Sequence, residues 1–153
     1  MNGRREKHNL TGERSLVIRS LELFTRNGKV SSVTVDMGKA YLKPGEIPAL
    51  LDGENIIARN AEIGGKEYSM TCVSVGNPHC VIFVDNVDKV DIEKTGPQIE
   101  NAEIFPERIN TEFVRVVNRR TLKMRVWERG NGETLACGTG ACAAAVAAVV
   151  ECK

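Results

Sequence analysis

The chain is organised around Glu128-Arg129-Gly130-Asn131-Gly132-Glu133-Thr134-Leu135-Ala136-Cys137-Gly138-Thr139-Gly140-Ala141-Cys142, which sets a cysteine among small residues ahead of an alanine run. Alanine is the best helix former, so a helix is predicted to begin at Thr139, with that threonine as its N-cap. Cys137 then lies just before a helix N-terminus, where unpaired N–H groups and the positive end of the helix dipole favour an anion. This pattern predicts that Cys137 is a catalytic thiolate, acting as an acid or base on a small anionic substrate.

Length and charge limit the number of domains and the kinds of partner that the chain can have. The 153 residues, 42% of them hydrophobic and 27% charged, are enough for one domain with a core or for parts of two smaller ones. A net charge of +1 indicates neither a nucleic acid nor an acidic membrane as a partner. The longest apolar run, residues 141–150, is shorter than the roughly 20 residues of a membrane-spanning helix.

The five cysteines are odd in number, and the polar residues 1–14 do not resemble a signal peptide. We therefore expect free thiols in a reducing cytoplasm. There is no CxxC pair and His79-Cys80 stands alone, so we expect no metal site. A core or structural role is expected for the remaining cysteines, Cys72, Cys80, Cys142 and Cys152.

The first part of the chain is predicted to be a β-hairpin. Residues 15–24 and 30–37 alternate between apolar and polar, and Asn27-Gly28 between them is a strong hairpin turn signal. Residues 1–12 are expected to be irregular. The glycines and prolines of residues 39–65 indicate a linker, with the boundary between two units at residues 36–43.

The second part is predicted to mix strands and helices. Residues 66–75, 80–84, 112–118 and 122–127 have the apolar patterns of strands, and 91–100 has the pattern of a helix capped by Asp91. Residues 105–110 are expected to form a loop. Together with the helix from Thr139, this gives an α+β fold class.

Three segments place polar side chains beside predicted strand ends or a helix start: 77–79, 108–113 and 128–139. Such loops, held by a rigid scaffold, are where chemistry tends to be found. Amides, a carboxylate and an arginine suit the ammonium and carboxylate groups of an amino acid, and backbone N–H groups at the helix start suit its α-carboxylate. The candidate binding residues are Asn77, Asn110, Glu128, Arg129, Gly138 and Thr139, and His79 and Glu128 could adjust the charge of Cys137.

Each of these residues also has a structural interpretation when taken alone. Asn77 before Pro78 is often a turn residue, and a single histidine such as His79 is more often a hydrogen-bonded core residue. Glu128-Arg129 could be a surface ion pair, and Cys137 an inert buried thiol. Only their combination favours a functional site.

The combination resembles the diaminopimelate epimerase family. The similar segments are Gly76-Asn77-Pro78-His79, Arg108-Ile109-Asn110-Thr111-Glu112-Phe113, Glu128-Arg129-Gly130 with Gly132-Glu133-Thr134, and Ala136-Cys137-Gly138-Thr139-Gly140. The resemblance implies an isomerase of lysine biosynthesis that interconverts LL- and meso-diaminopimelate with two cysteines on opposite faces of the α-carbon. It implies neither pyridoxal phosphate nor a metal, so no cofactor is expected.

The resemblance also implies roles for single residues. Cys137 matches one of the two cysteines, usually the proton acceptor, and His79 and Glu128 match residues that adjust the charge of the cysteines. Asn77, Asn110, Glu128, Arg129, Gly138 and Thr139 match substrate-binding positions. The family fold has two similar domains, each a β-barrel-like sheet around a central helix, and homodimers are usual.

The sequence departs from the family at both ends. The family's first cysteine lies in a Cys-Gly-Asn-Gly motif, of which Met1-Asn2-Gly3 resembles only the tail, and the last strands are missing. We therefore expect residues 1–37 to be a hairpin of the N-terminal domain and 38–153 a C-terminal domain, incomplete at its C-terminus. Without the first cysteine, the chain alone is expected to be inactive or nearly so.

Three alternatives remain open at this stage. One is a related cofactor-independent isomerase, proline-racemase-like or of phenazine synthesis. A second is a dinucleotide-binding module, because residues 138–143 fit a loose GxGxxA pattern, although no strand is predicted directly before it. The third is a non-catalytic fragment.

Overall fold

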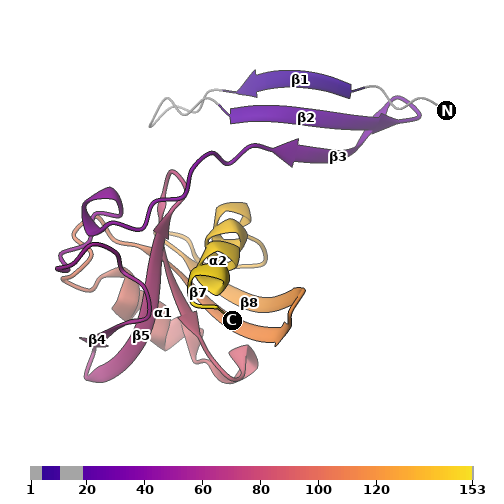
Figure 1. The fold of residues 1–153 in the computed structure, drawn as a ribbon. Coiled ribbons are helices and arrows are strands. Elements are labelled where there is room, and N and C mark those ends of the chain that lie inside the picture. Colours follow the sequence, from indigo (N-terminus) through magenta and orange to yellow (C-terminus); the bar gives the residue numbers. More distant parts are fainter. Residues whose placement is uncertain (1–4, 11–18, 153) are drawn as a thin grey trace. The chain divides into compact units, whose positions relative to one another are not determined.

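The computed structural model describes residues 5–10 and 19–152, and its contacts divide the chain into two units, residues 1–39 and 40–153 (Figure 1). The described part of the first unit is an antiparallel sheet of β1 (Arg5–Leu10), β2 (Arg19–Arg26) and β3 (Lys29–Val35), in that order. Asn27 and Gly28 join β2 to β3 with φ values of 53° and 73°, as a tight hairpin turn requires. The predicted hairpin is therefore confirmed.

Residues 5–10 form a strand, whereas residues 1–12 were predicted to be irregular. They pair with β2 from Arg5↔Phe24 to Leu10↔Arg19. Their polar sequence gives no strand pattern of its own, so the strand depends on its partner. The strand predicted for residues 15–24 begins outside the described residues, because its residues 15–18 are not among them.

The second unit is built on a six-stranded sheet in the order β4-β5-β6-β7-β8-β9. Only β6 and β7 pair in parallel, and α1 lies between them in the chain. The fold is thus mixed α+β, as predicted, and the sheet is open rather than closed into a barrel. Its strands are β4 (Arg59–Ile63), β5 (Lys66–Ser74), β6 (Pro78–Phe83), β7 (Asn110–Asn118), β8 (Thr121–Glu128) and β9 (Gly132–Thr134).

Helices contact the two faces of this sheet. On one face α1 (Ile92–Glu100) contacts β7, β8 and β9, and its residue Gly96 lies against Trp127. On the other face α2 (Gly138–Val150) contacts β5 to β8, and its residue Gly140 lies against Glu112. Figure 1 shows α2, in yellow, lying against the strands.

The larger hydrophobic core lies on the α1 side, where alternate strand residues point. Its fully buried members are Ile47, Ile56, Met70, Cys72, Cys80, Ile92, Ile99, Phe105, Ile109 and Phe113. On the α2 side the helix buries only small residues, Gly140, Ala143, Ala144 and Ala147, which allow it to approach the sheet closely. Its other side exposes Val149 at 76%.

Several short elements were not predicted. The segment expected to be a linker with short turns contains such a turn, the 3-10 turn η1 (Pro44–Glu46), but also the edge strand β4, which was not predicted. The turn η2 (Val87–Lys89) and β9 are further additions. The helix predicted for residues 91–100 is confirmed, and Asp91 caps it by accepting a hydrogen bond from the Lys94 amide at 3.3 Å. Asn110, expected in a loop, is the first residue of β7.

Candidate functional site

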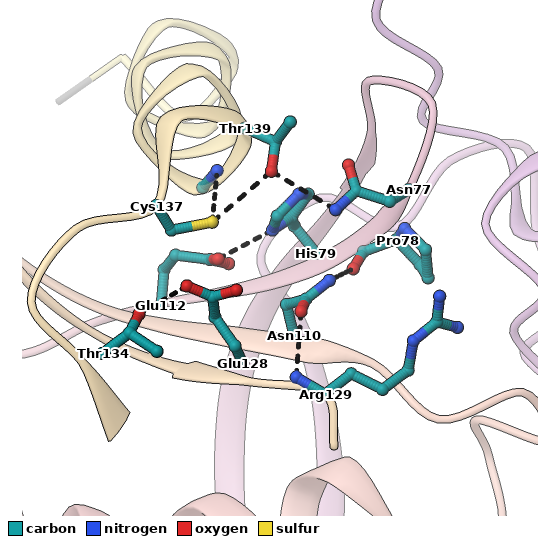
Figure 2. A network of polar contacts seen from close by, with 11 residues as sticks. Asn77, Pro78, His79, Asn110, Glu112, Glu128, Arg129, Thr134, Cys137 and Thr139 are labelled. Carbon is teal, nitrogen blue, oxygen red and sulfur yellow. Dashed lines mark hydrogen bonds and ion pairs between the residues drawn. The ribbon is translucent and has the colours of Figure 1, made fainter. Parts of the chain in front are cut away.

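The sheet register brings the predicted polar residues to the face that α2 covers. His79 of β6 pairs with Asn110 of β7, and Glu112 of β7 pairs with Val126 of β8. Because paired residues point to one face and successive residues alternate, His79, Asn110, Glu112 and Glu128 share a face. Figure 2 shows these side chains gathered beneath the start of α2.

Cys137 is itself the N-cap of α2, which corrects the prediction that Thr139 caps the helix. Its backbone is extended, with φ −135° and ψ 109°, and its carbonyl accepts the Ala141 amide at 2.9 Å. The sulfur accepts a hydrogen bond from the Gly140 amide at 3.3 Å and lies 3.4 Å from the Thr139 hydroxyl. Donors directed at Sγ at the positive end of a helix can stabilise negative charge on that sulfur.

Beneath the cysteine, His79 and Glu112 form a buried pair. Their side chains are both 0% exposed, and Nδ1 of the imidazole lies 2.7 Å from Oε1 of the carboxyl. Burial raises the pKa of Glu112, the hydrogen bond with His79 opposes that rise, and the charge of Glu128 adds to it. Among the described residues, Nε2 of His79 and Oε2 of Glu112 have no hydrogen-bond partner.

Glu128 and Asn77 lie on either side of this pair. Glu128 is half-buried at the end of β8 and accepts a short hydrogen bond from the Thr134 hydroxyl of β9. Asn77, in the turn before β6, donates to the Thr139 hydroxyl at 3.3 Å. Thr139 therefore links the Asn77 turn to the cysteine sulfur, and the site spans three separate segments of the chain (Figure 2).

Asn110 and Arg129, two of the predicted binding residues, make hydrogen bonds to the backbone of neighbouring loops. The buried Asn110 amide donates to the Pro78 carbonyl at 2.7 Å and accepts the Arg129 amide at 2.9 Å, so it joins two loops. The Arg129 guanidinium donates to the carbonyl oxygen of Glu107 at 2.8 Å. In Figure 2 its side chain points away from Cys137. The exposed Gly138 begins α2 and directs no side chain at the site.

Glu100, at the end of α1, holds the loop after Arg129 by hydrogen bonds from the opposite face of the sheet. Its buried carboxylate accepts from Trp127 Nε1 at 2.7 Å, from the Gly130 amide at 2.9 Å and from Arg108 at 3.1 Å. Three donors compensate the cost of burying this charge. The sequence predicts no role for Glu100, and it places Thr134 and Glu112 only within segments similar to the family.

The dinucleotide alternative lacks the structural context that it requires. A dinucleotide fingerprint follows a parallel strand, whereas the strand before α2 is β9, a three-residue strand antiparallel to β8. Gly140, in the first turn of α2, instead gives room to the cysteine sulfur and to Glu112.

Comparison with known proteins identifies the family of the chain. The protein-family model described as "Diaminopimelate epimerase" matches residues 71–153, the segment that contains the candidate site residues. The chain belongs to the diaminopimelate epimerase family. It is similar to proteins with this name from Acetivibrio thermocellus, at 57% identity over 134 residues, and from Phocaeicola vulgatus, at 50% over 152 residues.

These alignments cover 88% and 99% of the chain but only 48% and 54% of the two relatives. A third relative of the same name, from Cyanothece sp., is 58% identical over 78% of the chain and 43% of its own length. The chain therefore spans about half the length of the diaminopimelate epimerases that it matches. Among the described residues, no helix combines the length and the apolar character needed to cross a membrane.

Proposed function

We propose that this chain provides one half of the active site of a diaminopimelate epimerase, with Cys137 as the proton-transferring group on one face of the substrate's α-carbon. The observation that carries the proposal is the sulfur of Cys137, held at the start of α2 by the Gly140 amide and the Thr139 hydroxyl. In the reaction the thiolate takes the α-proton, leaving the electron pair on the α-carbon. A second acid on the opposite face then donates a proton there, which inverts the centre without a cofactor.

The surrounding groups support a substrate that is an amino acid with charged ends. Backbone N–H groups at the start of α2, at Gly138 and Thr139, suit its α-carboxylate. Glu128, half-buried between Glu112 and Thr134, offers a carboxylate to an ammonium group. Asn77, Asn110 and Arg129 complete the proposed binding set, with Arg129 requiring a turn of its side chain away from the Glu107 carbonyl.

The proposal includes the domain assignment. We propose that residues 1–37 belong to the first of two family domains and 38–153 to the second, and that the complete enzyme is a homodimer. The division of contacts between Lys39 and Ala40 supports two units. Epimerisation needs a second proton-carrying group opposite Cys137, and Cys72 and Cys80 are buried on the α1 side of the sheet. We therefore expect the 153-residue chain alone to yield no meso product.

The test is whether diaminopimelate protects Cys137 from iodoacetamide. Because residues 130–153 form one tryptic peptide with three cysteines, the experiment uses the Cys142→Ala, Cys152→Ser chain and follows label by mass spectrometry. At a ligand concentration near twice Kd, labelling should slow about threefold, since protection scales as 1 + [L]/Kd. Lysine, which lacks the second amino-acid centre, and NAD are the controls.

Equal labelling with and without diaminopimelate, up to high millimolar ligand, contradicts the proposal. Protection by NAD instead favours the dinucleotide alternative. The same samples, kept with LL-diaminopimelate in D₂O, test the expectation that the chain alone yields no meso product. Formation of deuterated meso product by the purified chain overturns the expectation that it is inactive alone.

A further inference from the structure

The buried carboxyl of Glu112 has no role in the proposed proton transfer, yet it lies at the centre of the site. It is 0% exposed on the middle of β7, with β6 and β8 on either side and α2 above it. Oε1 faces Nδ1 of His79 at 2.7 Å. A Cβ built on Gly140 would lie 2.6 Å from the same oxygen and 3.2 Å from the Cys137 sulfur, so both atoms border one small space at the first turn of α2.

This geometry decides which nitrogen of His79 can exchange a proton. The proton of a neutral imidazole is held on the nitrogen whose N–H has an acceptor, and the other nitrogen keeps its lone pair. A carboxylate next to Nδ1 provides such an acceptor, as in metal and catalytic sites where a carboxylate fixes a histidine. The first turn of α2 favours negative charge on the oxygen that it borders.

We propose that Glu112 is a positioning residue that keeps the neutral His79 in its Nδ1–H form and leaves Nε2 as the nitrogen that gains and loses a proton. Glu112 thereby sets the tautomer of the imidazole that lies beneath Cys137. The consequence for catalysis rests on the proposed function, in which His79 adjusts the charge of Cys137. The assignment of the proton itself does not depend on that function.

The charged and titratable groups around Glu112 come from each packed element. His79 and Cys80 belong to β6, Glu128 to β8, and Cys137 to the start of α2. Burial and the negative charge of Glu128 raise the pKa of Glu112, whereas His79 lowers it. A folded-state pKa above the unfolded value means that stability falls as pH rises from the unfolded value of about 4.3 through the folded value.

The test is the ¹⁵N NMR spectrum of the imidazoles in the full 153-residue chain above neutral pH. The chain has only two histidines, His8 and His79, and a His8→Gln variant assigns them. Wild type should show His79 with a protonated, pyrrole-type Nδ1 and a pyridine-type Nε2. In Glu112→Leu no acceptor remains beside Nδ1, so His79 should lose its preference for the Nδ1–H form; Glu103→Gln, an exposed glutamate, should leave it unchanged.

Wild-type His79 in the Nε2–H form overturns the inference without any variant, so failure of Glu112→Leu to fold does not prevent a decision. An undiminished Nδ1–H form in a folded Glu112→Leu chain also overturns it. Because no substrate is used, these outcomes are separate from the protection of Cys137 by diaminopimelate.

Discussion

Gly140→Ala should destabilise the second unit, although alanine normally favours a helix over glycine by about 1 kcal/mol. The new methyl group would lie 2.6 Å from Oε1 of Glu112, closer than such atoms can approach, and 3.2 Å from the Cys137 sulfur, which is a tight contact. Glu112 is enclosed by three strands and cannot move without losing its contact with His79. Overpacking costs about 1–3 kcal/mol, so we expect a net loss of stability in urea unfolding.

Gly138→Ala is the matched control, because a Cβ there meets nothing within 4 Å and the residue lies in the same helical turn. It should leave stability unchanged or raise it slightly. The fluorescence of Trp127, the single tryptophan, reports unfolding of the second unit specifically. In the Glu112→Ala background the Gly140→Ala penalty should shrink, and equal penalties in both backgrounds would show that the carboxyl is not the obstacle.

The fold was predictable where a strand or helix carries its own pattern. The alternating residues of 112–118 and 122–127 predicted β7 and β8, and Asn27-Gly28 predicted the first hairpin. β1 and β4 could not be predicted this way. Both are polar, β4 exposes most of its residues, and each exists through pairing with one neighbour. Such edge strands depend on tertiary context rather than on local preference.

In the candidate site, residue types indicated the chemistry but not the partners. Cys137 before a small-residue helix start was predictable, whereas its function as the N-cap depends on the backbone angles of the turn. Glu112 falls within a strand that also contains Arg115 and three other polar residues, and an acidic side chain in such a strand usually faces solvent. Its burial follows from the parallel pairing of β6 with β7, which brings two segments 33 residues apart into contact. The sequence of the strand itself therefore gave no signal that this glutamate would be buried.

The largest loss of stability is expected for Gly96→Ala, on the other face of the sheet. A Cβ at Gly96 would lie 2.4, 2.5 and 2.8 Å from three atoms of the Trp127 ring, in the buried middle of α1. The indole cannot turn aside easily, because its Nε1 donates to Glu100 at 2.7 Å. We expect a loss of about 3 kcal/mol in urea unfolding, at the upper end for overpacking, despite the better helix propensity of alanine.

Gly45→Ala, in the open turn η1, has no atom within 4 Å of its Cβ and is the control for a glycine substitution in this unit. If Gly96→Ala is as stable to urea as Gly45→Ala, the Trp127 ring can move away from the new methyl group and the prediction is wrong. The effect should also reach the site, because the Glu100 carboxylate that holds Trp127 also holds the Gly130 amide beside Arg129. Displacing the indole therefore loosens the loop that carries Glu128 and Arg129, and diaminopimelate should protect Cys137 less in this variant even where it remains folded.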